Sequence, residues 1–472
     1  MLRFCEEGIY NVNAKEGAVL NRIKDFTTGP IVSQLVRLAL PIMGTSFIQM
    51  TYTMVDIAWL GRLGSAAVAA AGAASFFVWL GNALALNTKI GAEVGVSQSI
   101  GAGLIDKART FASTSLTVAL ALALVYGVFL FTAAPLLIGF FGLNPSITLN
   151  GVNFLRIIAF GAPFIFLNAT FTSVYNATGQ SKIPFVINLT GLLFNMVLDP
   201  LLIFGIGLPK MGVAGAALAT TLSQGVVTAL FIYEITGPRK LFNHFRILVI
   251  PQWHFVKLIL KRGFPASLQN SLFAFFSMNL ARIAAEWGHI GVTCLSIGSQ
   301  IEAVSWNTAL GFSTALSAFV GQNYGAQKVH RIKRAYFSTV GVLGVWGMLV
   351  GVLFVVFGDI IFSLFLSEPL AIEQGAIYLR ILGFSQLFMV LEIASAGAFT
   401  GIGRTLPPSI QSITLTGARI PLAMALTATS LQLSGVWWSI TLSSICKGIL
   451  LPLLFLYVLR RMMYAPRNNV SI

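Results

Sequence analysis

The stretch FLRIIAFGAPF at residues 154–164 recurs in altered form as YLRILGFSQLF at residues 378–388. Their residue numbers differ by an offset of 224, and the same offset places Pro41 on Pro265 and Pro184 on Pro408. This register runs without a gap from the first apolar segment of each half to the fifth. The chain is therefore a tandem repeat of one structural unit.

Each half consists mainly of apolar segments that are long enough to cross a bilayer, which takes about 20 residues. Twelve such segments lie at 34–60, 66–90, 110–139, 149–175, 183–206, 212–235, 257–284, 289–316, 334–364, 375–400, 407–430 and 434–459. Of the 472 residues, 56% are hydrophobic and 10% are charged, against about 25% charged residues in an average soluble domain. The sequence predicts an all-α integral membrane protein of about twelve transmembrane helices.

The repeat also predicts the architecture. Each half holds six spans, an even number, so both halves begin on the same side of the membrane. This is a parallel repeat of two pseudo-symmetric six-helix bundles, as in transporters with a site between the bundles. The expected domains are a cytoplasmic N-terminal segment at 1–33, an N-lobe (helices 1–6) at 34–235, a cytoplasmic connection at 236–256, a C-lobe (helices 7–12) at 257–460 and a cytoplasmic tail at 461–472.

The formal net charge of +15 comes from basic residues that gather on one side of the predicted membrane. With the N-terminus in the cytoplasm, the inside-facing connections hold 21 Lys and Arg residues and the outside-facing connections hold two, Arg62 and Lys210. Such asymmetry is the positive-inside signal. It predicts a multi-pass protein of the plasma (inner) membrane with both termini cytoplasmic, and it argues against nucleic acid as a partner.

Two acids stand out within the predicted spans of the N-terminal half, because charged groups inside a bilayer are costly and are usually functional. Asp56 is the only charged residue between Arg37 and Arg62, and Gln49 lies two turns before it on the same helical face. Asp199 lies one turn after Asn195. These carboxylate and amide oxygens, with the hydroxyl of Thr220, could hold a sodium ion at Asp56, Asn195 and Asp199. A carboxylate in apolar surroundings could instead carry a proton.

The alternative is that the two acids are structural, capping a helix or bonding a neighbour's backbone. At the repeat offset of 224, Asp56 falls on Leu280 and Asp199 falls on Ala423. A residue needed only for packing would recur in both copies more often. We therefore expect the acids to couple ions in one half only, with Pro41 allowing the helix that carries Asp56 to bend.

The C-terminal half has intramembrane charges of its own. Glu302 and Glu392 are candidates for contact with a cationic substrate or a second cation. The alternative, which the sequence leaves open, is that they pair with Arg282 or Arg419 and only neutralise buried charge. The chain shows no HExxH motif, no GxSxG motif and no clustered His or Cys ligands, so we expect neither an enzyme nor a bound cofactor.

Several motifs together resemble the multidrug and toxic compound extrusion (MATE) family, in its prokaryotic branch. They are MVDIAWLGRLG (54–64), VSQSIGAG (96–103) with its copy VGQNYGAQ (320–327), YNATGQSKIP (175–184), FNMVLDPLLIFG (194–205) and GVAGAALAT (212–220). The resemblance implies antiport by alternating access, in which inward movement of H⁺ or Na⁺ drives export of small organic, drug-like or cationic compounds. It also implies an N-lobe cation site at Gln49, Asp56, Asn195, Asp199 and Thr220. The tenth-helix acid of one branch would fall on Met389, one turn before Glu392.

Two other functions fit the sequence less well. A flippase for lipid-linked oligosaccharides has a related architecture, but it should present Arg and Lys from both lobes, whereas the N-lobe here offers acids. A receptor or membrane scaffold gives no reason for the duplication or for buried acids. We expect small-molecule substrates, a bilayer environment and a monomer, while the coupling ion and the substrate stay open.

Overall fold

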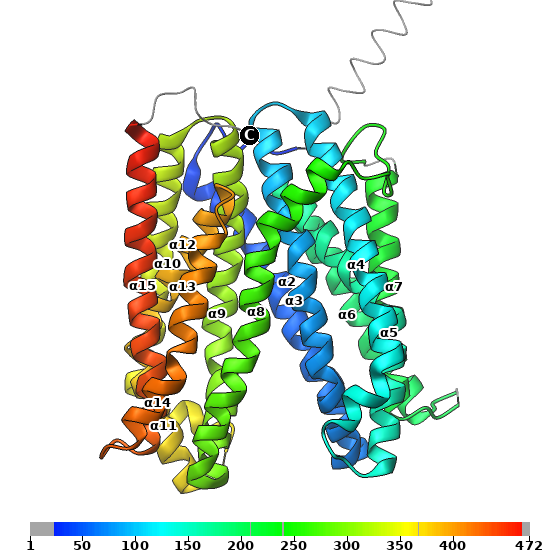
Figure 1. Cartoon of the computed structure of the whole chain (residues 1–472), viewed down its shortest axis with the longest axis vertical. Helices are drawn as coiled ribbons and strands as arrows, with labels where there is room; N and C mark the ends of the chain where they lie inside the picture. The colour runs from blue at the N-terminus through cyan, green and yellow to red at the C-terminus, as the bar shows by residue number, and fades with distance from the viewer. Residues whose placement is uncertain (1–22, 208, 238–239, 367, 465–472) are drawn as a thin grey trace, which may run out of the picture. The chain divides into compact units, whose positions relative to one another are not determined.

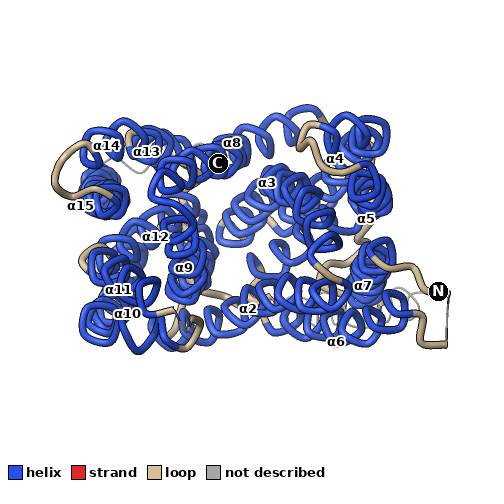
Figure 2. The backbone as a smooth tube through the Cα atoms, turned by 90° about the horizontal axis from the view of Figure 1, so that it is seen from below, coloured by secondary structure: helices blue, strands red, loops and turns tan. Residues whose placement is uncertain are grey.

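The computed structural model of the chain describes residues 23–207, 209–237, 240–366 and 368–464. These residues are mostly helical and contain no β-strand (Figures 1 and 2). The helices are α2 (Ile31–Leu63), α3 (Ser65–Gly101), α4 (Ile105–Gly139), α5 (Pro145–Ala177), α6 (Lys182–Phe204), α7 (Val213–Thr236), α8 (Trp253–Ala284), the short 3₁₀ helix η1 (Ala285–Trp287), α9 (Gly288–Gly325), α10 (Val329–Ser363), α11 (Pro369–Gly383), α12 (Gln386–Gly401), α13 (Leu406–Gly417), α14 (Arg419–Thr427) and α15 (Leu433–Tyr464).

Every predicted span coincides with one of these helices or with a consecutive pair. Span 375–400 falls on α11 and α12, and span 407–430 falls on α13 and α14. Among the described residues, eight helices are each long and apolar enough to cross a bilayer, and the pair α11–α12 makes a ninth span. The remaining spans, α8, α9 and α13–α14, carry more polar residues. The prediction of an all-α membrane protein is confirmed.

Several helices run further than predicted, and α3 and α9 do so by the largest margin. α3 continues past residue 90 to Gly101, and α9 continues past residue 316 to Gly325. The added part of α3 includes Glu93 and Gln98, which are 4% and 2% exposed. Hydropathy ends a span at such polar residues, whereas the folded protein buries them against neighbouring helices. The predicted connections after these helices are therefore shorter than the sequence suggested.

Two spans of the C-terminal half are broken. α11 and α12 meet at a bend of 52°, where the Ser385 hydroxyl donates to the Leu382 carbonyl at 2.9 Å and competes with the helical backbone pattern. α13 ends at Gly417 and α14 begins at Arg419, two residues before Pro421. Because proline has no amide hydrogen and its ring clashes with the preceding turn, a break at this point is expected.

The chain forms two compact units. Among the described residues, the first unit comprises residues 23–26 and 44–263, and the second comprises residues 27–43 and 264–464. Both borders fall inside helices, after Met43 in α2 and after Gly263 in α8, each within two residues of a helix-weakening proline, Pro41 or Pro265. The lobes expected at 34–235 and 257–460 therefore differ from these units. The first part of α2 belongs to the second unit, and the first part of α8 belongs to the first unit.

The first unit is organised around α5, which packs against α3, α4 and α7. Small residues line these contacts and let the backbones approach closely. At Gly127 of α4, for example, a Cβ atom would stand 2.8 Å from the Ala159 carbonyl oxygen of α5. The tight packing holds the polar residues of this unit in fixed positions.

The second unit is organised around α12, which packs against α9, α10 and α15. A Cβ atom at Gly448 of α15 would stand 2.2 Å from the Phe388 carbonyl oxygen of α12.

Most of the predicted N-terminal segment 1–33 and tail 461–472 lies outside the described residues, at 1–22 and 465–472.

Candidate functional site

The first unit brings Asp56 of α2 and Asp199 of α6 side by side, although the two residues are far apart in the sequence. Their carboxyl groups interact with each other directly. Asp199 is fully buried, and Asp56 is half-buried. Two carboxylates about 4 Å apart repel each other by about 4 kcal/mol at an effective dielectric constant of about 20. Such a pair favours the binding of a proton or a metal cation between its members.

Two neutral side chains hold the acids in place. The Thr220 hydroxyl of α7 donates to Oδ2 of Asp56 at 3.3 Å, and the Asn195 side-chain amide donates to Oδ1 of Asp199 at the same distance. Asn195 lies one helical turn before Asp199 and is itself fully buried. Each carboxylate thus accepts a hydrogen bond from a neutral donor.

Four buried oxygen atoms of this cluster have no hydrogen-bond partner among the described residues. They are Oδ1 of Asp56, Oδ2 of Asp199, Oδ1 of Asn195 and the hydroxyl oxygen of Tyr52. Buried polar atoms are normally paired, so these oxygens are available to bind a proton, a cation or water. We name Tyr52, Asp56, Asn195, Asp199 and Thr220 the acid cluster.

Tyr52 did not enter the sequence-based prediction. It lies one turn before Asp56 on α2, is 9% exposed, and interacts electrostatically with both acids. The spacing of four residues, which puts both side chains on one helical face, was the available signal.

Four of the five predicted coupling residues lie together in the structure, and the fifth does not. Asp56, Asn195, Asp199 and Thr220 come together in the acid cluster. Gln49 is exposed, and no hydrogen bond joins it to the cluster within the described part of the chain. The roles of all five in ion coupling stay predictions.

Oxygen atoms dominate the acid cluster, as hard cations such as Na⁺ prefer. The described residues include no group of three or more His, Cys, Asp or Glu side chains suited to a metal ion. A cation at this cluster would therefore be held by two carboxylates together with amide and hydroxyl oxygens. The same two carboxylates would serve equally as a proton carrier.

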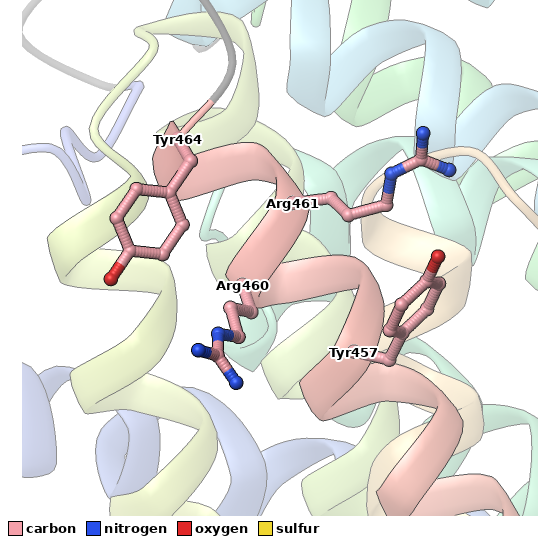
Figure 3. Close-up of a pocket in the computed structure, with 4 residues that line it drawn as sticks. All are labelled: Tyr457, Arg460, Arg461 and Tyr464. Atoms are coloured by element: carbon pink, nitrogen blue, oxygen red, sulfur yellow. The ribbon is translucent and has the colours of Figure 1, made fainter.

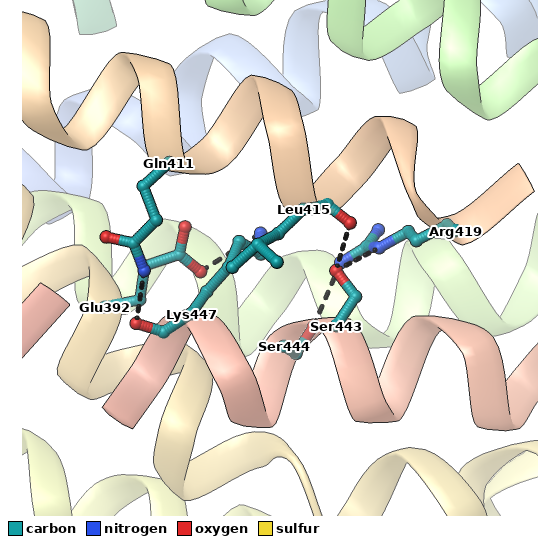
Figure 4. Close-up of polar contacts among 7 residues, drawn as sticks. All are labelled: Glu392, Gln411, Leu415, Arg419, Ser443, Ser444 and Lys447. Carbon is teal, nitrogen blue, oxygen red and sulfur yellow. Dashed lines mark hydrogen bonds and ion pairs between the residues drawn. The ribbon is translucent and has the colours of Figure 1, made fainter. Parts of the chain in front are cut away.

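The two predicted acids of the second unit have different partners. Glu302 of α9 accepts a hydrogen bond from the Gln386 amide of α12 at 3.2 Å. Glu392 of α12 forms an ion pair with Lys447 of α15 at 3.1 Å (Figure 4). Arg282, the other base considered for pairing, is exposed. Glu392 is thus paired with a base that the sequence-based pairing did not include. Contact of either acid with a substrate or a second cation stays a prediction.

Two hollows lie apart from the acid cluster. One, of about 500 Å³, is bordered by Tyr457, Arg460, Arg461 and Tyr464 at the end of α15, where these side chains spread over the helix surface (Figure 3). Another, of about 290 Å³, lies among mostly apolar side chains of α3, α4 and α5, with Asn87 at its wall. Neither is lined by an acid.

The comparison with known proteins starts from a family model described as MatE, which matches residues 41–201 and again residues 265–425. Both ends of the second match are displaced from those of the first by the same offset of 224 that relates the internal repeats. The part of the chain that the family model describes, from α2 into α6, therefore recurs from α8 into α14.

Relatives match over nearly the whole chain. The probable multidrug resistance protein NorM of Thermotoga maritima is 31% identical over 439 residues, covering 90% of this chain and 92% of that protein. The multidrug export protein MepA of Staphylococcus aureus is 24% identical, covering 92% of this chain and 95% of that protein. The solved structure of an outward-facing multidrug resistance MATE family transporter matches with a TM-score of 0.85 and 25% identity, over 93% of this chain and 98% of that chain.

Proposed function

Because the chain belongs to the MatE family of multidrug and toxic compound extrusion transporters, we propose that it exports small drug-like molecules across the plasma membrane in exchange for a cation. The relatives named above are a multidrug resistance protein and a multidrug export protein. The acid cluster supplies what such an exchange needs, a buried site that binds a cation or a proton reversibly. The proposed cycle uses no bound cofactor and no covalent chemistry.

The observation that carries the proposal is the set of unpaired oxygens around Asp56 and Asp199. With the site empty, the two carboxylates repel each other and favour a shape that keeps them apart or hydrated. With a cation or a proton between them, the repulsion disappears and α2 can close on α6. A ligand shifts an equilibrium between two shapes only by its difference in affinity for them, and the acid pair provides that difference.

α2 connects the acid cluster to the rest of the molecule. Its first part, up to Met43, belongs to the second unit, and the part that carries Asp56 belongs to the first. Pro41 removes one backbone hydrogen bond near the border between the two parts. A movement of the Asp56 half on ion binding would therefore be relayed along one bendable helix. We propose this relay as the basis of alternating access.

The flippase alternative is less well supported by the site. A flippase of lipid-linked oligosaccharides should face its anionic cargo with Arg and Lys from both lobes. In the first unit, the charged members of the cluster are the two acids Asp56 and Asp199. Their arrangement favours a cation.

Transport in proteoliposomes tests the proposal. Vesicles containing the purified protein and a fluorescent organic cation such as ethidium should show ethidium movement when a proton or sodium gradient is imposed, with each ion tested separately. Asp56→Asn, which keeps the shape of the side chain and removes its charge, should abolish the gradient-driven part. The matched control is Asp106→Asn, because the side chain of Asp106 is 89% exposed at the start of α4. Normal transport by Asp56→Asn under both gradients would show that the acid cluster is not the coupling site.

A further inference from the structure

The repeat gives the residues of the acid cluster counterparts in the second unit. At the offset of 224, Asn195 corresponds to Arg419 and Asp199 corresponds to Ala423. Asp56 corresponds in the same way to Leu280. Ala423 and Leu280 are 0% and 3% exposed, so the second unit buries apolar side chains where the first unit buries acids. An amide has been exchanged for a permanent positive charge at the same time.

In the last span of each unit the register shifts to an offset of 223. This offset aligns the Gly-Val pair at 212–213 with the one at 435–436, and Gly225 with Gly448. The connection before α15 is one residue shorter in this alignment, which accounts for the shift. Thr220 of the acid cluster then corresponds to Ser443.

A structural contact supports this register independently. In the first unit the side-chain amide of Asn168 donates to Oε1 of Gln224 at 2.8 Å. Their counterparts are Glu392, at an offset of 224, and Lys447, at an offset of 223, and these two form the buried ion pair of 3.1 Å. The same two positions are thus in contact in both units, with an amide pair in one and an ion pair in the other.

Arg419 reaches across the second unit to the counterpart of Thr220. Its Nε donates to the Ser443 hydroxyl at 3.1 Å, and a terminal guanidinium nitrogen donates to the Ser444 hydroxyl at 3.0 Å (Figure 4). Arg419 is 7% exposed. Its guanidinium therefore bridges the two positions that, in the first unit, belong to Asn195 and Thr220 and flank the acid pair. A permanent positive charge is thus buried beside the counterpart of Thr220.

The charges around Arg419 balance without a direct ion pair. Among the described residues, no carboxylate lies within 4.0 Å of its nitrogens. Glu302, Glu392 and Tyr378 interact with Arg419 electrostatically, as does Lys447 from α15. Two acids and two bases together give this region a formal net charge of zero. It has no excess negative charge to attract a further cation, unlike the acid cluster.

The backbone also places Arg419 where transporters commonly bind ions. It is the first residue of α14, directly after the break that separates α14 from α13. Coupling ions in many transporters bind at such breaks in discontinuous membrane helices. In the first unit, the corresponding helix α6 runs unbroken through Asn195 to Phe204.

We propose that the guanidinium of Arg419 is a built-in cation that occupies, in the second unit, the place of the coupling ion of the first unit. The inference rests on the proposed function. Its consequence is that the second unit binds no coupling ion, so that a single ion site serves each transport cycle. Coupling is then asymmetric although the fold is repeated.

Grafting the acid cluster onto the second unit tests this inference. The readout is the thermal unfolding midpoint of the purified full-length protein in detergent, measured as Na⁺ replaces choline and, separately, as pH is lowered. The wild type should respond to one of these ions, and Asp56→Asn should abolish the response. Adding Arg419→Asn together with Ala423→Asp to Asp56→Asn should restore a response, because the graft recreates the Asn and Asp pair of α6. Arg380→Asn in the same background is the matched control and should restore nothing, since Arg380 is an exposed arginine paired with Asp359.

The outcomes separate the two proposals. A folded graft without an ion response, beside a wild type that responds, would overturn the role of Arg419 and leave the proposed function intact. A wild type without any ion response would overturn both.

If the graft does not fold, two single variants test whether the positive charge of Arg419 is needed. Arg419→Lys keeps a fixed positive charge and should retain ethidium efflux within about threefold, whereas Arg419→Gln keeps hydrogen bonding to the serines and should lose more than tenfold. Retained efflux in Arg419→Gln, or its loss in Arg419→Lys, would show that the arginine acts through its hydrogen bonds and shape.

Discussion

Replacing Glu392 by glutamine should destabilise the second unit, because Lys447 would be left as a buried charge without its counter-ion. The side chains of Glu392 and Lys447 are 13% and 8% exposed, and their charged atoms are 3.1 Å apart. Two unit charges at this distance attract each other by about 5 kcal/mol at an effective dielectric constant of about 20. Removing one partner of a buried pair typically costs about 3–5 kcal/mol. We expect a loss in this range for Glu392→Gln.

The assay is a double-mutant cycle on unfolding of the purified protein in mixed micelles. Lys447→Met removes the charge and keeps most of the aliphatic side chain. Combined with Glu392→Gln, it should recover most of the lost stability, since neither member of the pair then leaves its partner behind as a buried charge. If Glu392→Gln unfolds at the wild-type denaturant concentration, or if the double variant is no more stable than Glu392→Gln alone, the ion pair is not a buried stabilising contact.

Two further predictions concern packing and the acid cluster. Gly448→Ala should lower the yield of folded protein and its unfolding midpoint, because the new Cβ atom would stand 2.2 Å from the Phe388 carbonyl oxygen. The control Gly341→Ala should be close to wild type in the same measurement, since no atom lies within 4 Å of its Cβ position. Thr220→Val should lower the half-saturating proton concentration of transport by about fivefold, because the lost hydrogen bond of about 1 kcal/mol stabilises the empty, charged form of Asp56. An unchanged half-saturating concentration would exclude this contact from the site.

Most of the fold followed from hydropathy and the internal repeat. The positions of the twelve spans and the repeat offset of 224 both appear in the sequence, because a bilayer demands long apolar segments and a duplication keeps its register. The break at Phe384 and Ser385 did not, since that span contains no interior proline and its first copy, α5, is continuous. The first part of α2 belongs to the second unit, and the first part of α8 belongs to the first unit. This grouping depends on contacts between segments distant in the sequence, which hydrophobic periodicity does not reveal.

The candidate site was predictable to the extent that charge inside a membrane is rare. Asp56 and Asp199 were identifiable one by one, and their contact with each other became visible only in the folded protein. Tyr52 was missed because a tyrosine in an apolar span has many ordinary roles. The pairing of Glu392 with Lys447 was missed because hydropathy gives the position of a helix along the chain and not its rotation against a neighbour.

The direct test of cation-coupled export is whether substrate movement can drive the ion. Proteoliposomes with an ethidium gradient, and with equal pH and equal Na⁺ on both sides, would be monitored for the appearance of a proton or sodium gradient. The wild type should move one of these ions in the direction opposite to ethidium, and Asp56→Asn should move neither while its control Asp106→Asn behaves as the wild type. Ethidium that crosses through the wild-type protein without moving either ion would contradict cation exchange at the acid cluster.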